Sequence, residues 1–143
     1  MDQAPPAVDV RELADRLEIA DLYVRYALAL DEQDLDLLAA VFAPDVKFKC
    51  GIPGVPYREG IKANQDRLLE RHRKEDFRER HLTAPPVIRS LTPTRAETSA
   101  EAVIVKRKAG GEPHIEAMGR YNDVLEKRDG RWVFVARAFH ADK

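Results

Sequence analysis

Cysteine is almost absent from this chain of 143 residues, in which Cys50 is the only one. A single cysteine cannot form an internal disulfide, so we expect a protein of a reducing compartment, the cytoplasm. An excess of charge is also absent, because 24 Lys and Arg oppose 25 Asp and Glu. This balance argues against a nucleic-acid-binding protein and against a basic membrane-binding surface.

Long hydrophobic runs are missing too. None approaches the roughly 20 residues of a membrane-spanning helix, and the opening MDQAPPAVDV lacks the basic and apolar regions of a signal peptide. We expect residues 1–8 to form a flexible N-terminus. With 44% hydrophobic and 34% charged residues, the composition is typical of a soluble globular protein, and the length predicts one domain over residues 1–143.

Cofactor and metal motifs are not found. The chain has no Gly-rich phosphate loop, no nucleophile elbow and no helix with two zinc-binding histidines. The four histidines, His72, His81, His114 and His140, show no metal-ligand spacing. We therefore expect neither a metal nor an organic cofactor. The run ERHRKEDFRERH around His72 predicts a solvated face, with His81 opening a strand directly after it.

The first half of the sequence has the pattern of helices. Asp9 can cap a helix over about residues 9–31, and Asp34 can cap a short second helix through LDLLAAVF. A third helix is predicted for the segment REGIKANQDRLLERHRKED. In the first helix, a stripe of apolar residues at helical spacing is expected to face the core: Leu13, Leu17, Ala20, Val24, Ala27 and Leu28.

The second half predicts strands. RHLTAPPVIRSL is interrupted by Pro85 and Pro86, and two turn signals, AGGE and RDGR, separate the last three strands. Helices followed by an antiparallel meander indicate an α+β fold, with helices packed on one face of a curved sheet. The small Ala117 and Gly119 are expected on the inner face beside Tyr121, where they would leave room for a ligand.

The last strand, WVFVARAFH, is apolar on both faces if its side chains alternate. Trp132, Phe134, Ala136 and Ala138 would share one face, and Val133, Val135, Arg137 and Phe139 the other. We expect a homodimer to cover the outer face, since large exposed apolar patches are rare on monomers. The alternative is that Val133 and Val135 are exposed residues that favour strand structure.

The segment YALALDEQD places a carboxylate, Asp31, at the end of a dense apolar run. A negative charge is unfavourable beside the C-terminal end of a helix dipole, so Asp31 either points into water or has a compensating partner. His81 in turn is either a structural histidine or a residue that points into the core.

Two segments of the chain resemble segments of SnoaL-like proteins in the nuclear-transport-factor-like superfamily: EIADLYVRYALALDEQDLDLLAAVFAPDVKF and, later, GRYNDVLEKRDGRWVFVAR. The resemblance covers about residues 10–140. It implies a cone in which three helices and a strongly bent antiparallel sheet enclose an apolar pocket. The chain is most similar to the branch with scytalone dehydratase, bile-acid dehydratase and hexachlorocyclohexane dehydrochlorinase.

Asp31 and His81 stand where that branch has a catalytic aspartate and histidine. Tyr26 and Arg137 match a tyrosine of the bile-acid dehydratase and an arginine of the dehydrochlorinase. The resemblance thus implies a cofactor-free lyase or isomerase in which the His81–Asp31 pair removes a proton from a small apolar carbonyl or hydroxylated substrate. Cys50 stands where ketosteroid isomerases have an aspartate, so their chemistry is not expected.

Several residues keep two interpretations. Tyr26 could donate a proton or a hydrogen bond to the substrate, or it could pack in the core. Tyr23 is the alternative candidate for the donor role. Tyr121 and Tyr57 are further candidates for substrate binding, with Tyr57 either at an entrance or merely packed. Arg137 could anchor substrate or pair with Glu116 or Asp123.

Two classes of function remain open from the sequence. The first is an enzyme that begins with proton abstraction, whether a dehydratase, an isomerase or a polyketide cyclase. The second is a non-catalytic ligand-binding or assembly module of the same fold, because fold alone does not decide function.

Overall fold

The computed structural model describes residues 3–5 and 7–143. Part of the expected flexible N-terminus, namely Met1, Asp2 and Pro6, lies outside the described residues. The elements of the described chain follow in the order α1 (Val10–Asp31), α2 (Leu35–Val41), β1 (Phe42–Cys50), β2 (Arg58–Glu59), α3 (Gly60–Lys74), β3 (Phe77–Thr83), β4 (Val87–Leu91), β5 (Arg95–Lys108), β6 (His114–Arg128) and β7 (Arg131–Ala141).

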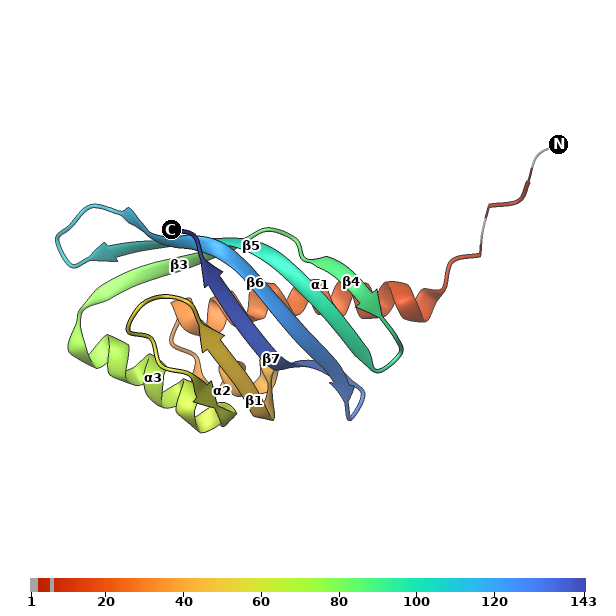
Figure 1. Ribbon diagram of the computed structural model, residues 1–143, viewed down its shortest axis with the longest axis horizontal. Coiled ribbons are helices and arrows are strands. Elements are labelled where there is room, and N and C mark those ends of the chain that lie inside the picture. Colours follow the sequence, from red (N-terminus) through yellow and green to blue (C-terminus); the bar gives the residue numbers. More distant parts are fainter. Residues whose placement is uncertain (1–2, 6) are drawn as a thin grey trace.

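The strands form one open, curved sheet in the order β2-β1-β7-β6-β5-β3, and β4 also pairs with β5. Figure 1 shows this sheet arching over α1, while α2 and α3 lie toward one end of the arch. The predicted α+β cone is confirmed. The sheet is mixed rather than purely antiparallel, because β1 runs parallel to β7 while the other pairs are antiparallel.

Helix α1 begins where the sequence predicts, since the Asp9 carboxylate accepts hydrogen bonds from the backbone N–H groups of Arg11 and Glu12. Its core face differs from the prediction. Of the predicted stripe, four residues are between 47% and 65% exposed: Leu13, Leu17, Val24 and Leu28. Ala27 of the predicted stripe is buried as expected, but the rest of the buried face is formed by Ile19, Leu22, Tyr23, Tyr26 and Ala29.

The physical reason is that α1 carries two apolar stripes, and packing against the sheet selects the aromatic one. Asp15 fixes the rotation of the helix from within. Its carboxylate accepts hydrogen bonds from the indole Nε1 of Trp132 at 2.9 Å and from Lys127 Nζ at 3.0 Å. Asp15 is 4% exposed, so this polar contact commits one side of α1 to β7.

Strand β3 begins at Phe77, four residues before the predicted start at His81. The charged run is therefore not one solvated helical face: it ends α3 and continues into a strand whose alternate residues Phe77, Glu79 and His81 are buried. Pro85 and Pro86 separate β3 from β4, and both strands pair with β5.

Strand β7 contains a bulge that the alternation pattern did not reveal. Val124 of β6 pairs with Ala136 and Leu125 pairs with Phe134, which leaves Val135 without a partner. The extra residue reverses the alternation, so the buried Phe134 and Arg137 are three positions apart. The predicted faces of the last strand are therefore wrong after Phe134. The homodimer, which was inferred from those faces, stays a prediction.

Gly119 serves strand packing rather than ligand space. A Cβ atom at this position would collide with the backbone carbonyl of His140 on β7 and crowd the Cα atom of Ala141. The missing side chain is thus what allows β6 and β7 to approach each other at this point.

We expect Gly119→Ala to lower the free energy of unfolding by about 3 kcal/mol, because the methyl group overpacks rigid backbone. Gly110→Ala is the matched control. Gly110 has a positive φ of 73° in the β5–β6 turn but open space around it, so only conformational strain of about 1 kcal/mol is expected there. Urea denaturation of both variants measures the difference, and equal losses would contradict the steric explanation.

Candidate functional site

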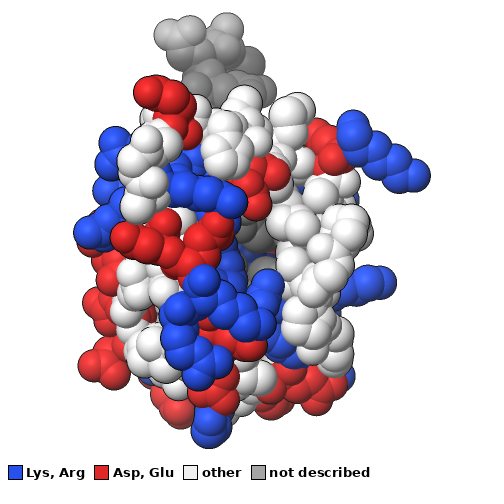
Figure 2. All heavy atoms as spheres, turned by 90° about the vertical axis from the view of Figure 1, so that its left-hand side faces the viewer, with Lys and Arg blue, Asp and Glu red and all other residues white. Residues whose placement is uncertain are grey.

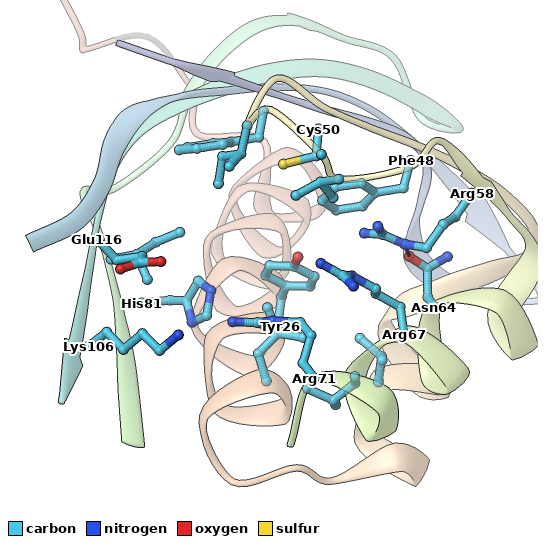
Figure 3. A pocket seen from close by; sticks show the side chains of 18 of the residues that line it. Tyr26, Phe48, Cys50, Arg58, Asn64, Arg67, Arg71, His81, Lys106 and Glu116 are labelled. Carbon is cyan, nitrogen blue, oxygen red and sulfur yellow. Dashed lines mark hydrogen bonds between the residues drawn. The ribbon is translucent and has the colours of Figure 1, made fainter. Parts of the chain in front are cut away.

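A cavity of about 410 Å³ opens between α1, α3 and the inner face of the sheet. Its apolar walls come from helices and strands far apart in the sequence: Leu38, Phe42, Phe48, Leu68, Ile104 and Phe139. Figure 3 shows the polar side chains that point into it, with His81 on one side, Tyr26 in the middle and a group of arginines on the other. The cavity is therefore apolar in its walls and polar at defined positions.

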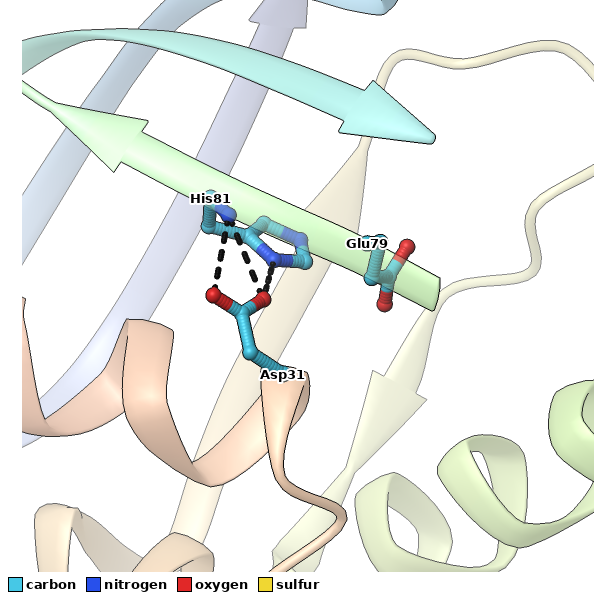
Figure 4. Close-up of side chains that lie close together, drawn as sticks. All are labelled: Asp31, Glu79 and His81. Atoms are coloured by element: carbon cyan, nitrogen blue, oxygen red, sulfur yellow. Dashed lines mark hydrogen bonds and ion pairs between the residues drawn. The ribbon is translucent and has the colours of Figure 1, made fainter. Parts of the chain in front are cut away.

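Asp31 and His81 are in direct contact, as predicted. Asp31 Oδ1 lies 2.7 Å from His81 Nδ1, and both carboxylate oxygens accept the backbone N–H of His81 at 3.2 Å (Figure 4). The two side chains are 7% and 5% exposed. A carboxylate at Nδ1 stabilises the tautomer with the proton on Nδ1, which leaves Nε2 as an acceptor. Nε2 has no hydrogen-bond partner among the described residues, and His81 lines the cavity.

Asp31 contacts His81 from the side that faces away from the cavity. Five residues of an α-helix turn through a net angle of about 140°, so Tyr26 and Asp31 leave α1 in different directions. Tyr26 lines the cavity, whereas Asp31 does not. His81 lies between them, held by Asp31 and with its ring centroid 6.5 Å from that of Tyr26. Asp31 can therefore orient the histidine without contact to a ligand.

Tyr26 and Tyr121 form the aromatic floor of the cavity, with ring centroids 6.0 Å apart. Neither hydroxyl group has a hydrogen-bond partner among the described residues. Burial raises the pKa of Tyr26 to about 12, although the nearby Arg137 and Arg58 oppose this, and burial raises the pKa of Tyr121 as well. Both phenols stay protonated near neutral pH and can donate a hydrogen bond to a ligand.

Arg137 lies beneath this floor rather than in the cavity. Its guanidinium carbon is 3.6 Å from the ring centroid of Tyr121 and 4.1 Å from that of Tyr26. Its Nε lies 3.5 Å from Asp123 Oδ1, and both side chains are fully buried. Of the partners considered from the sequence, Asp123 is the one observed. Arg137 does not line the cavity, so its role in anchoring a substrate stays a prediction.

The other two tyrosines also lie outside the cavity. Tyr23 is buried, and its hydroxyl contacts Thr98 and donates to Asp123, whose pKa burial raises to about 6. Tyr57 is 54% exposed, donates to Glu59 at 2.8 Å and lines a groove on the outer face of the sheet. Neither position provides a contact to a ligand beside His81.

Glu79 belongs to the site but was missed from the sequence. Its two oxygens accept from Arg71 at 3.0 and 2.7 Å, and its side chain is fully buried. The signal was available, because a residue two positions before His81 on one strand shares its face. Asp31, Glu79 and His81 also bring potential metal ligands within 4.8 Å of one another (Figure 4). Arg71 and His81 already engage the two carboxylates, so a cation would have to displace Arg71.

The arginines of the cavity were missed as well. Arg58 comes from β2, and Arg67 and Arg71 from α3. Figure 2 shows the end of the molecule where the cavity opens, with Lys and Arg side chains beside the hollow. Spacing could have indicated them, because Asn64, Arg67 and Arg71 recur at helical positions of one face.

In the part of the chain that the structure describes, no helix has the length and apolarity needed to cross a membrane.

Comparison with known proteins gives a family and three informative structures. The model of the SnoaL-like domain matches residues 11–138, and no curated protein matches the chain by sequence. A candidate scytalone dehydratase from Novosphingobium aromaticivorans is 22% identical, with 93% of this chain and 87% of that one covered and a TM-score of 0.80. The type 3 hexachlorocyclohexane dehydrochlorinase of Novosphingobium barchaimii is 18% identical, with 95% and 92% covered and a TM-score of 0.81.

The third structure is the beta subunit of a candidate aromatic-ring-hydroxylating dioxygenase from Novosphingobium aromaticivorans. It is 24% identical, with 94% and 93% covered and a TM-score of 0.78. At these identities the three likenesses establish the fold alone. The family match covers most of the chain: this protein belongs to the SnoaL-like family of the nuclear-transport-factor-like superfamily.

Proposed function

We propose that this protein is a lyase or isomerase that removes a proton from carbon next to a carbonyl group, with His81 as the base. The observation that carries the proposal is the orientation of His81. Asp31 holds Nδ1, while Nε2 has no hydrogen-bond partner among the described residues, and His81 lines a cavity with apolar walls. A positioned base of this kind contributes about 10²- to 10⁴-fold to a rate.

The reaction would begin when Nε2 of His81 takes the proton from the substrate carbon. The buried Asp31 carboxylate stabilises the resulting imidazolium. The electron pair of the broken C–H bond moves toward the carbonyl, and the Tyr26 hydroxyl donates a hydrogen bond to the developing enolate oxygen. In an elimination the electron pair then forms a C=C bond as the leaving group departs, and the proton on His81 passes to that group or to water.

Two structural neighbours support an elimination, because the candidate scytalone dehydratase and the dehydrochlorinase are named for the loss of water and of hydrogen chloride. An isomerase or a polyketide cyclase would use the same first step. The dioxygenase beta subunit favours the alternative of an assembly module. A free base in an open cavity supports the enzyme over that alternative.

The first prediction concerns the His81–Asp31 pair. With 4-oxo-4-phenylbutanoate as probe in D₂O, the protein should accelerate exchange of the protons next to the ketone, followed by ¹H NMR. His81→Gln should reduce the enzyme-dependent rate by about 10²- to 10⁴-fold, and Asp31→Asn by at least about tenfold through loss of tautomer control. His140→Gln, at an exposed histidine, is the control. Exchange that His81→Gln leaves intact would refute the assignment.

The second prediction concerns Tyr26. Tyr26→Phe should slow exchange of the same probe by about tenfold or more, because the hydrogen bond to the enolate oxygen is lost. Thermal stability should stay unchanged, since the hydroxyl has no partner among the described residues. Tyr57→Phe, on the outer face, should affect neither quantity. An unchanged exchange rate in Tyr26→Phe would contradict this role and indicate that Tyr26 only packs in the core.

The third prediction concerns metal. Exhaustive chelation and dialysis should leave the exchange rate unchanged, because a histidine base held by a carboxylate needs no cation. A rate that disappears and returns with an added divalent cation would contradict the mechanism. It would indicate instead a metal bound by Asp31, Glu79 and His81, and Glu79→Gln would then weaken the response to the cation.

A further inference from the structure

More basic than acidic side chains line the cavity, whose acidic residues are Glu75 and Glu116. Five basic side chains line it: Arg58, Arg67, Arg71, Lys74 and Lys106. Three of them are already neutralised, by Glu79, Glu70 and Glu75, at distances of 2.7 to 2.9 Å. Arg58 and Arg67 have no carboxylate partner among the described residues.

Arg58 is held in place by neutral groups. Its Nε donates to Asn64 Oδ1 at 3.0 Å and its Nη1 to the carbonyl of Pro56 at 3.1 Å. The guanidinium carbon lies 4.6 Å from the ring centroid of Phe48. Asn64 is 5% exposed and is itself fixed by a hydrogen bond to the carbonyl of Gly60. The Arg58 side chain is therefore positioned in advance, and Nη2 has no partner among the described residues.

Arg67 is the less satisfied of the two. Its Nε is buried and has no hydrogen-bond partner among the described residues. Figure 3 shows Arg58 and Arg67 pointing toward the same part of the cavity, near the Tyr26 hydroxyl. Burial lowers the pKa of Arg58, and the charges of Arg67 and Arg71 act in the same direction. Two arginines that approach each other in a partly desolvated cavity repel, and an anion between them would offset that cost.

We propose that Arg58 and Arg67 form an oxyanion-binding subsite for the ligand, and that the substrate is an acid with an apolar body rather than a neutral apolar compound. The guanidinium fork matches the planar oxygens of a carboxylate. The apolar walls suit the rest of the ligand. Tyr26 lies between the two arginines and His81 (Figure 3), so the acid group would sit across the cavity from the base.

This inference rests on the proposed function for the role of the ligand as substrate, and binding can be measured without turnover. Calorimetric titration would compare 4-oxo-4-phenylbutanoate with its uncharged amide. We expect the acid to bind about 10- to 100-fold more tightly, the range for hydrogen bonds to charged groups. Arg67→Gln and Arg58→Gln should each remove most of this preference, and added salt should weaken it.

Arg73→Gln is the matched control, because Arg73 is an exposed arginine of α3 that does not line the cavity. It should keep the preference, and so should His81→Gln. The His81→Gln variant separates the two proposals. If it keeps the preference for the acid but loses proton exchange, both proposals are supported. If exchange depends on His81 but the protein shows no preference for the acid, only the subsite is refuted. Circular dichroism checks folding, and Arg67→Lys, which keeps the charge, should retain part of the preference.

Phenylphosphonate provides the second arm of the titration. Tighter binding of phenylphosphonate than of the carboxylate, lost in Arg67→Gln, would support the subsite and identify its anion as phosphoryl. Equal affinity for the acid and the amide, or no binding of any of these probes at millimolar concentration, would overturn the proposal.

Discussion

The rest of the site depends on the contact between the buried carboxylate of Asp31 and His81. It joins the last residue of α1 to β3 through both the backbone N–H and the ring of His81. A negative charge at the C-terminal end of a helix is unfavourable by itself, and these hydrogen bonds compensate for it. The same contact sets the distance between helix and sheet and the orientation of the imidazole, so fold and chemistry share one interaction.

A second polar layer supports the cavity from below and from the side. Arg137 stacks under Tyr26 and Tyr121, and Arg71 with Glu79 fixes the wall next to His81. Charges with internal partners make a rigid frame around an apolar space. Arg58 and Arg67 differ from these groups, because neither has a carboxylate partner among the described residues.

Much of the architecture could be predicted because it depends on local pattern. Capping by Asp9 and Asp34 located the starts of two helices. Pro85 and Pro86 marked an interruption in one predicted strand, where the structure has the two strands β3 and β4. The pairing of Asp31 with His81 was different. Fifty residues separate the two, so spacing could not reveal the contact, and the prediction came from resemblance to a family. Their catalytic role, like that of Tyr26, stays a prediction.

By itself the sequence determined most of the elements and their order, since helical and strand periodicity and turn residues act over a few neighbouring positions. Arg58 and Glu59 are an exception, because they were predicted to begin the third helix and form β2 instead. Only the tertiary structure decided which faces are buried. The sheet selected one of two apolar stripes on α1, and the unpaired Val135 reversed the faces of β7 and turned Arg137 inward. The convergence of Arg58 and Arg67 on the cavity was decided in the same way. Each of these outcomes depends on pairing and packing between distant segments, and such contacts leave no local pattern in the chain.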